Sequence, residues 1–137
     1  MSRILAIDYG TRRTGIAVSD SLRLIAGGLV TVETRQLEKW LADYFARENV
    51  GTIVLGKPAR MDGTPSETWR FIEPLAARLR QAWPDKEVVF HDERFTSVLA
   101  HRAMLESGIG KMARRDKALV DKISATIILQ SYMEFNQ

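Results

Sequence analysis

The N-terminal part of the chain contains the segment Ile4-Leu-Ala-Ile-Asp8-Tyr-Gly10-Thr-Arg-Arg-Thr-Gly15-Ile-Ala-Val-Ser-Asp20. Two short apolar runs rich in β-branched residues flank a polar segment bounded by glycines, which is typical of a β-hairpin. The first run, residues 4–7, is apolar without alternation, as expected for a strand that is covered on both faces. Asp8 follows directly, so we expect a carboxylate at the end of a central strand.

A carboxylate in such a place needs a compensating partner, because removing an unpaired charge from water is costly. Arg12 or Arg13, the backbone N–H groups of the turn, or a metal ion could compensate the charge of Asp8. The local pattern leaves open the alternative that Asp8 only closes the turn. A decision between these alternatives needs evidence from the rest of the chain.

Composition favours a single folded domain over residues 1–137, with 45% hydrophobic and 27% charged residues. The absence of cysteine excludes disulfides and thiolate metal sites and agrees with a reducing compartment. We recognise no signal peptide and no segment of membrane-spanning length, so we expect a cytoplasmic protein without a membrane partner. The net charge of +3 is too small to indicate nucleic-acid binding by itself.

Basic residues gather in one segment near the C-terminus. Within twelve residues the chain carries Lys111, Arg114, Arg115, Lys117 and Lys122, opposed only by Asp116 and Asp121. Such clustering suits a polyanionic partner, although a solvated surface segment has the same pattern. Residues 108–117 offer little that could anchor them in a core, so we expect a mobile loop there.

Hydrophobic periodicity predicts the remaining elements. A third strand is expected over 24–32, with a bulge or bend at the pair Gly27-Gly28. Two more strands are expected over 52–55 and 87–90. The predicted helices span 36–48, Ser66 to about Trp83 with a kink or a division at Pro74, Thr96 or Ser97 to about Glu106, and 116–134.

The order β-β-β-α-β-α-β-α predicts an α/β fold with a five-stranded mixed sheet. Three antiparallel strands come first, and two parallel strands follow through right-handed crossovers, with helices on both faces. On the last helix, one row of residues is expected to face inward, and it includes Val120, Ile123 and Ile127. Asp121 lies on an adjoining row with Ala125 and Ile128, at the border of the buried face.

Three carboxylates stand out by position: Asp8, Glu93 just after the fifth strand, and Asp121 on the last helix. Ligand sites in open α/β sheets form outside the carboxyl ends of parallel strands, and Asp121 reaches this place if its helix packs beside the first strand. Carboxylates that lie close together repel each other unless a cation lies among them. An all-oxygen set suits Mg²⁺ or Mn²⁺, which can activate water against a phosphodiester.

Few other catalytic groups are available. His91 and His101 are the only imidazoles in the chain. His91 stands beside two acids and is expected at the surface or behind the site, whereas His101 is expected to be structural. The residues therefore favour carboxylate and metal chemistry over nucleophilic catalysis.

Four motifs of this chain resemble, in the same order, those of the YqgF family (also called RuvX-type), small RNase H-like proteins of bacteria. They are Asp8–Asp20, Gly56–Gly63, Asp92–Ser97, and Lys117 with Asp121–Tyr132. The resemblance implies an RNase H-like fold, with Asp8, Glu93 and Asp121 as the catalytic and metal-binding triad. It also implies a nuclease, with maturation of the 5′ end of pre-16S ribosomal RNA as the favoured role.

Basic residues around the triad are expected to contact the nucleic-acid backbone, with an affinity that falls as salt rises. They are Arg12, Arg13, Lys57, Arg94, Lys111, Arg114, Arg115 and Lys117. At Lys57 the chain departs from the family pattern, in which an apolar residue is commoner. Precursor rRNA, and with it the pre-ribosomal particle, is the expected partner of a monomer or weak dimer.

Three other functions remain as alternatives. The first is an endonuclease for branched DNA such as Holliday junctions, which would use the same acids. The second is a nucleic-acid-binding protein without catalysis. The third is ATP binding, because residues 8–15 also resemble the phosphate-binding hairpin of actin-like folds. Those proteins enclose the nucleotide between two lobes, and this chain is long enough for one.

Overall fold

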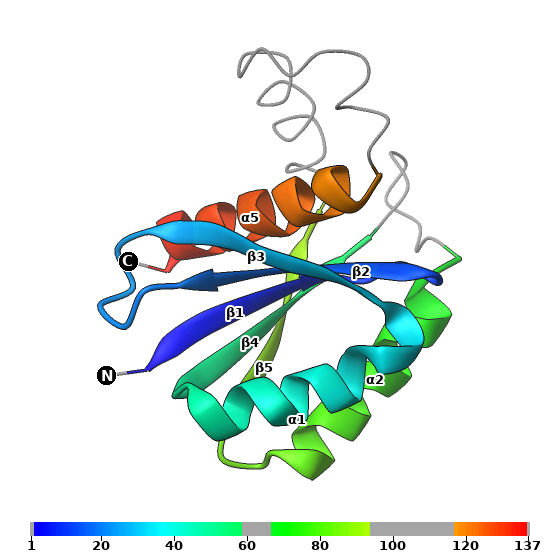
Figure 1. Cartoon of the computed structure of the whole chain (residues 1–137), viewed down its shortest axis with the longest axis horizontal. Helices are drawn as coiled ribbons and strands as arrows, with labels where there is room; N and C mark the ends of the chain where they lie inside the picture. The colour runs from blue at the N-terminus through cyan, green and yellow to red at the C-terminus, as the bar shows by residue number, and fades with distance from the viewer. Residues whose placement is uncertain (1, 59–66, 94–116, 137) are drawn as a thin grey trace.

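The computed structural model describes residues 2–58, 67–93 and 117–136, to which the following statements refer (Figure 1). The strands are β1 (Arg3–Asp8), β2 (Arg13–Ser19), β3 (Ala26–Glu33), β4 (Val50–Lys57) and β5 (Glu87–Asp92). The helices are the 3₁₀ turn η1 (Thr34–Gln36), α1 (Leu37–Arg47), α2 (Trp69–Ala82) and α5 (Lys117–Phe135).

The strands form one sheet in the order β3-β2-β1-β4-β5. Strand β2 pairs antiparallel with both β1 and β3, whereas β4 pairs parallel with β1 and with β5. The predicted five-stranded mixed sheet is therefore confirmed. The three parallel strands end at one edge of the sheet, at Asp8, Lys57 and Asp92.

The predicted irregularity in the third strand is confirmed next to its two glycines. Ile16 pairs with Val30 and Ala17 pairs with Gly28, which leaves Leu29 as the extra residue of a bulge. The strand begins two residues later than predicted, because the backbone N–H groups of residues 24 and 25 each donate to Oδ1 of Asp20 at 2.8 Å. Those residues therefore belong to the turn.

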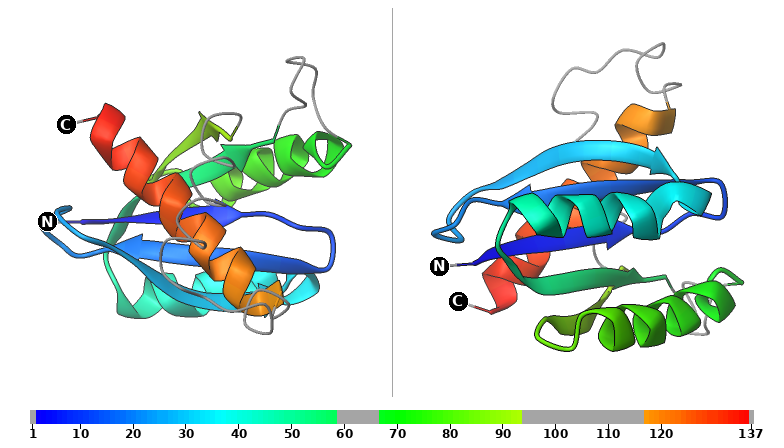
Figure 2. Two further views of the ribbon diagram at one scale, coloured as in Figure 1. Left: turned by 90° about the horizontal axis from the view of Figure 1, so that it is seen from above. Right: turned by 60° about the horizontal axis from the view of Figure 1, so that its bottom comes forward.

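Helices cover both faces of the sheet: α5 lies on one side, and α1 and α2 lie on the other (Figure 2). The core beneath α1 and α2 includes Leu5, Ile7, Ile16, Leu37, Leu41, Ile53, Leu55, Ile72, Leu75 and Leu79. The core beneath α5 is made of Ile4, Ala6, Ala17, Val54, Ala125, Ile128, Leu129 and Met133. The alternation along β1 sends residues 5 and 7 to one side and residues 4 and 6 to the other.

The inward face of α5 agrees with the prediction only in part. Ile127 is buried as expected, but Val120 and Ile123 are only half-buried, whereas Ala125 and Ile128 of the adjoining row pack against the sheet. The inward face therefore takes residues from both rows. The spacing of apolar residues did not single out one face, because this helix is apolar on several sides. Although α5 is apolar on several sides, no helix in the described parts of the chain is long and apolar enough to cross a lipid bilayer.

Helix α2 continues through Pro74, so the predicted division of this helix is wrong. Pro74 is the sixth residue of the helix, and its ring removes a single backbone hydrogen bond there. The expected cap Ser66, the helix expected from Thr96 or Ser97 to Glu106, and the expected loop up to residue 116 lie outside the described residues.

Replacing Leu41 by Ala tests the core beneath α1. Because Leu41 is fully buried, we expect a loss of about 3 kcal/mol in the free energy of unfolding, measured by urea denaturation. Leu24→Ala is the matched control, since Leu24 is 70% exposed, and its effect should stay within about 0.5 kcal/mol. Equal effects of the two substitutions would contradict this packing.

Candidate active site

Asp8 is the last residue of β1 and points to the side of the sheet that α5 covers. Ile4 and Ala6 of the same strand pack against α5, and the alternation of the strand places Asp8 on that side too. Its neighbour across the antiparallel pair is Gly15 of β2. The chain therefore presents this carboxyl group at the carboxyl end of a central strand, as predicted.

Glu93 reaches Asp8 because the parallel pairing continues one residue beyond β5. The backbone N–H of Glu93 donates to the carbonyl of Lys57 at 3.0 Å, and its carboxyl group shares a hydrogen bond with Asp8. Gly56 leaves the space that this requires: a Cβ there would lie 2.8 Å from Cδ of Glu93 and 2.8 Å from Cδ1 of Ile128. No pattern in the sequence indicated that Gly56 makes room for the Glu93 side chain.

Asp121 approaches from α5, which crosses β2 at another glycine. A Cβ on Gly15 would lie 2.1 Å from the backbone carbonyl oxygen of Asp121, so the helix can come this close only over a residue without a side chain. The Asp121 carboxylate accepts a hydrogen bond from Nε of Arg13 at 3.1 Å. In the sequence, Gly15 stood out only as a glycine at the boundary of the hairpin turn, and nothing there predicted its contact with the helix.

Burial and neighbouring negative charges change the pKa of the two central acids. The pKa of Asp8 is raised well above its usual value, mainly by burial, and further by the charge of Glu93, the hydrogen bond with it and the charge of Asp121. Burial also raises the pKa of Glu93, although its hydrogen bond with Asp8 acts in the opposite direction. The pair therefore retains a proton more readily than exposed carboxylates do.

His91 has a structural role. Its Nε2 lies 2.7 Å from Oγ of Ser131, and its ring contacts Tyr132 and Phe135 near the end of α5. Burial lowers the pKa of His91, and the charge of Asp92 only partly offsets this effect. The imidazole thus holds the far end of the helix to β5, which agrees with the expectation that it lies behind the site.

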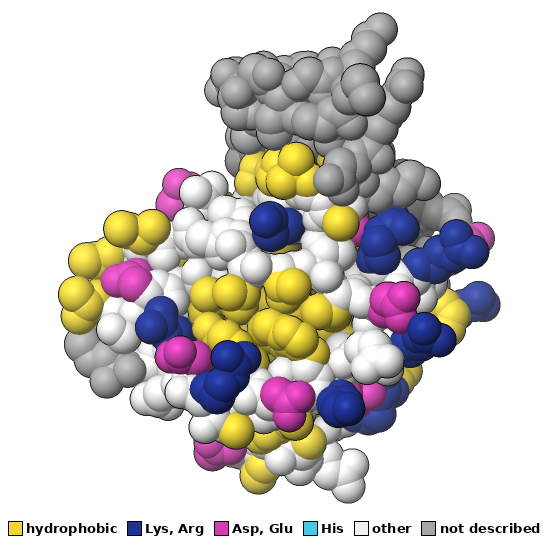
Figure 3. Space-filling model, in the orientation of Figure 1, with side chains coloured by type: hydrophobic (Ala, Val, Ile, Leu, Met, Phe, Trp, Pro, Cys, Tyr) yellow, Lys and Arg dark blue, Asp and Glu magenta, His cyan; other side chains and the backbone are white. Residues whose placement is uncertain are grey.

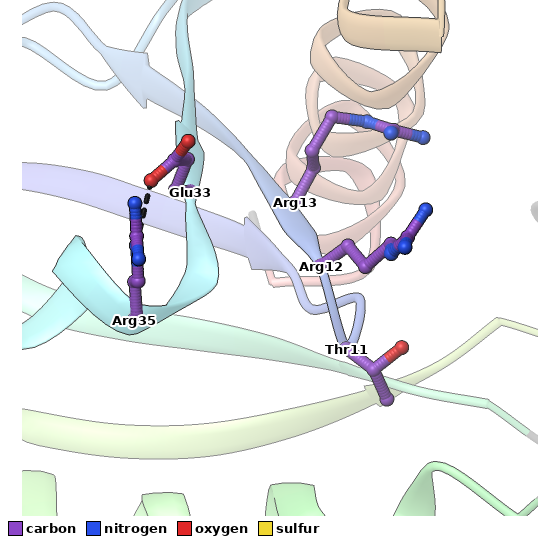
Figure 4. Close-up of a pocket in the computed structure, with 5 residues that line it drawn as sticks. All are labelled: Thr11, Arg12, Arg13, Glu33 and Arg35. Atoms are coloured by element: carbon purple, nitrogen blue, oxygen red, sulfur yellow. Dashed lines mark hydrogen bonds and ion pairs between the residues drawn. The ribbon is translucent and has the colours of Figure 1, made fainter.

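The described basic residues do not all meet at the acids. Arg13 pairs with Asp121, and Arg12 and Arg13 line a groove with Thr11, Glu33 and Arg35 (Figure 4). Lys57 lies at the end of β4, with Nζ 5.1 Å from the centroid of the Trp69 ring. Arg94, Lys111, Arg114, Arg115 and the side chain of Lys117 lie outside the described residues.

The donor set suits a hard divalent cation. In the described parts of the chain no three acidic or histidine side chains stand close enough to hold one ion, and the Asp121 carboxylate pairs with Arg13 instead. Two carboxylates are nevertheless sufficient for Mg²⁺, which keeps water and substrate oxygens as its other ligands. Asp8 and Glu93 meet this requirement, since they are in direct contact and their shared hydrogen bond needs a proton that a cation could replace.

The sheet order, helix α5 on one face and the acids at the end of β1 and just after β5 are those of an RNase H-like fold. A solved structure shares this fold: "T. thermophilus RuvC in complex with Holliday junction substrate" aligns with a TM-score of 0.57. The alignment covers 97% of this chain and 96% of that one, at 15% sequence identity. The predicted fold class is confirmed.

The chain belongs to the RuvX family. The model of this family, described as Holliday junction resolvase, matches residues 2–135. A Porphyromonas gingivalis protein named "Putative pre-16S rRNA nuclease" is 57% identical over 98% of this chain and 97% of its own length. A Bacteroides thetaiotaomicron protein of the same name is 56% identical over the same shares. The family resemblance found in the sequence is thereby confirmed.

Gly15→Ala tests the contact between α5 and the sheet. We expect a loss of more than about 2 kcal/mol in the free energy of unfolding, because the methyl group would meet backbone rather than a flexible side chain. Gly27→Ala in β3 is the control, since an added Cβ meets nothing within 4 Å there. Equal melting temperatures for the two variants would show that the helix does not lie this close.

Asp8→Asn tests the electrostatics of the pair in the presence of EDTA. Because the pKa of Asp8 is raised by folding, ionisation of this group disfavours the folded state as the pH rises above the pKa of the unfolded chain. The variant should therefore have a higher melting temperature than wild type at pH 7.5. The increase should be about 4 °C for each kcal/mol that the substitution adds to the free energy of unfolding. The difference should shrink as the pH falls towards 4.

The control for this comparison is Asp43→Asn, which changes an exposed carboxylate on α1. Its melting temperature should follow that of the wild type across the pH range. An Asp8→Asn protein that is less stable than wild type at every pH would contradict the cost of ionising Asp8 that burial and the charge of Glu93 impose.

Proposed function

We propose that this protein is a divalent-metal-dependent nuclease that hydrolyses phosphodiester bonds in the 5′-end maturation of pre-16S ribosomal RNA. The observation that carries the proposal is the buried contact between the carboxyl groups of Asp8 and Glu93 at the carboxyl edge of the sheet. The name of the relatives at 57% and 56% identity supports the choice of substrate. With an RNA precursor as substrate, the protein would act in the cytoplasm.

Asp8 and Glu93 are the proposed ligands of Mg²⁺ or Mn²⁺, with Asp121 as the third acid of the triad. When bound, such an ion supplies positive charge that activates water and stabilises the leaving oxygen of a phosphodiester. The contribution of the chain is to hold the carboxyl groups together. Gly56 gives the Glu93 carboxyl its place, and the pair releases its shared proton when both groups ionise.

Arg13 binds the Asp121 carboxylate in the free protein. The two side chains are 38% and 26% exposed, so water weakens their attraction and the pair can exchange partners. A phosphate oxygen of the substrate can then take the place of the Asp121 carboxylate on the guanidinium, because Arg binds phosphate and carboxylate with the same geometry. Asp121 would thereby become free to join Asp8 and Glu93.

The other basic residues are proposed to contact the nucleic-acid backbone. Of these, Arg12 lies next to Arg13 in the turn, and Lys57 lies one residue after Gly56. The proposal also includes basic residues that lie close to Glu93 or Asp121 along the sequence. They are Arg94, Lys111, Arg114, Arg115 and Lys117. Such contacts position a substrate without identifying its bases, so they leave the cleavage sequence to other features of the RNA.

A second candidate function is cleavage of branched DNA. It is favoured by the description of the matching family model as Holliday junction resolvase. The same acids would serve both substrates, so cleavage of a pre-16S rRNA fragment must be compared with cleavage of a four-way DNA junction by the purified protein. Faster cleavage of the junction would overturn the choice of RNA and leave the nuclease proposal standing.

Removing one carboxylate tests the metal site. Asp8→Asn should lower the rate of RNA cleavage in Mg²⁺ or Mn²⁺ about 100-fold or more, because an electrostatic group at the reaction centre is lost. It should also abolish thermal stabilisation by Mn²⁺, which for wild type should reach about 1.4 kcal/mol at ten times the dissociation constant. Asp43→Asn should keep both properties. Wild-type cleavage by the Asp8→Asn protein would refute the proposed role.

A further inference from the structure

A groove lies beside the candidate active site, between the β1–β2 turn and the end of β3. It is lined by Thr11, Arg12, Arg13, Glu33 and Arg35 and has a volume of about 520 Å³ (Figure 4). Figure 3 shows Lys and Arg side chains gathered on this side of the molecule, to the right in that view. The groove therefore belongs to a positively charged surface next to the acids.

The two walls of the groove are held together by hydrogen bonds. The Thr34 backbone N–H donates to the carbonyl of Arg12 at 2.9 Å, and the Thr34 hydroxyl donates to the carbonyl of Gly10. The buried Thr14 hydroxyl lies 2.8 Å from the hydroxyl of Thr34. These contacts join η1 to the turn, so the backbone beneath Arg12 and Arg35 keeps a fixed separation.

The charges in this groove favour an anion, because its lining has three guanidinium groups and one carboxylate. The carboxylate, that of Glu33, pairs with Arg35 at 2.8 Å, whereas the side chains of Arg12 and Arg13 extend away from this pair (Figure 4). The side chains of Glu33 and Arg35 are 60% and 79% exposed, so this pair is weak and leaves other N–H groups of Arg35 available. Arg12 forms no ion pair with any residue in 2–58, 67–93 or 117–136. Guanidinium groups match the geometry of a phosphate.

Arg13 connects the groove to the acids. It lines the groove, and its Nε contacts the Asp121 carboxylate at 3.1 Å. A strand with its scissile phosphate at Asp8 and Glu93 would therefore pass Arg13 and enter the groove on the β3 side. Lys57 ends β4, which lies between β1 and β5, so its positive charge is at the same edge of the sheet as the acids.

We infer that this groove is a second phosphate subsite, in which Arg12 and Arg35 bind separate backbone phosphates of the RNA strand beyond the scissile bond. The inference rests on the proposed function, because that function supplies the strand. Arg35 and Glu33 are the residues that no sequence motif singled out. Arg35 binds one of these phosphates, and Glu33 opposes binding by its charge.

The test measures binding of a 5′-fluorescein-labelled single-stranded RNA of twelve nucleotides by fluorescence anisotropy, in EDTA and at several KCl concentrations. Arg12→Gln and Arg35→Gln should each weaken binding severalfold and reduce the slope of log K against log salt by about 0.7. Glu33→Gln should strengthen binding, because it removes the opposing carboxylate. A residue that only supports the fold would not produce these opposite effects.

The matched control is the ion pair between Arg78 and Glu38, which also joins exposed side chains, at 3.0 Å, and does not line the groove. Arg78→Gln and Glu38→Gln change the net charge in the same way, and both should leave the salt slope unchanged. Equal effects of Arg78→Gln and Arg35→Gln would overturn the subsite, as would a wild-type slope for folded Arg35→Gln protein.

The same measurements separate this inference from the proposed function, because binding is followed without a metal ion. If the groove variants behave as expected and wild type cleaves neither RNA nor a DNA junction, the subsite stands and the nuclease proposal falls. If cleavage depends on Asp8 but the groove variants bind like wild type, the subsite alone falls.

Discussion

Helix α5 lies close against the sheet because β2 has no side chain at the point where the helix crosses it. A methyl group on Gly15 would stand 2.1 Å from the Asp121 carbonyl oxygen, so any other residue would move the helix outward. Gly56 makes room for the Glu93 carboxyl in the same way. Strands β2 and β4 lie on either side of β1, and each has a glycine at the point of close approach. The arrangement of the three acids therefore depends on Gly15 and Gly56, which have no Cβ.

This close packing brings the side chains of acids from distant segments together. Asp8 and Glu93 lie in direct contact, and burial raises the pKa of both. Arg13 balances Asp121, but it lies partly in water, where an ion pair contributes little. The fold thus maintains an electrostatically unfavourable group of carboxyls. Such groups are typical of functional sites, because the ligand supplies the missing charge.

The RNase H-like fold by itself does not determine the substrate, because one fold supports many functions. The solved RuvC complex shares the fold at 15% identity, and the family model and the relatives carry names for different nucleic-acid substrates. The surface around the acids carries basic residues in two places. Arg12 and Arg35 line the groove beside the β1–β2 turn, and Lys57 lies at the end of β4.

The sequence by itself determined the elements that depend on near neighbours. The apolar run before Asp8, the helical spacing that predicts α1 and the glycine pair beside the bulge act over a few residues, so the pattern of residues contains them. The family motifs also pointed to the three acids. Their approach to one another could be predicted only on the condition that the last helix packs beside β1.

Only the tertiary structure decided how distant segments meet. Which face of α5 turns inward was not in the pattern, because that helix is apolar on several sides. The pairing of Arg13 with Asp121 joins residues 108 positions apart, and Gly15 is needed only because that same helix crosses it. Such contacts depend on the distance between packed elements, which the spacing of residues along the chain does not contain.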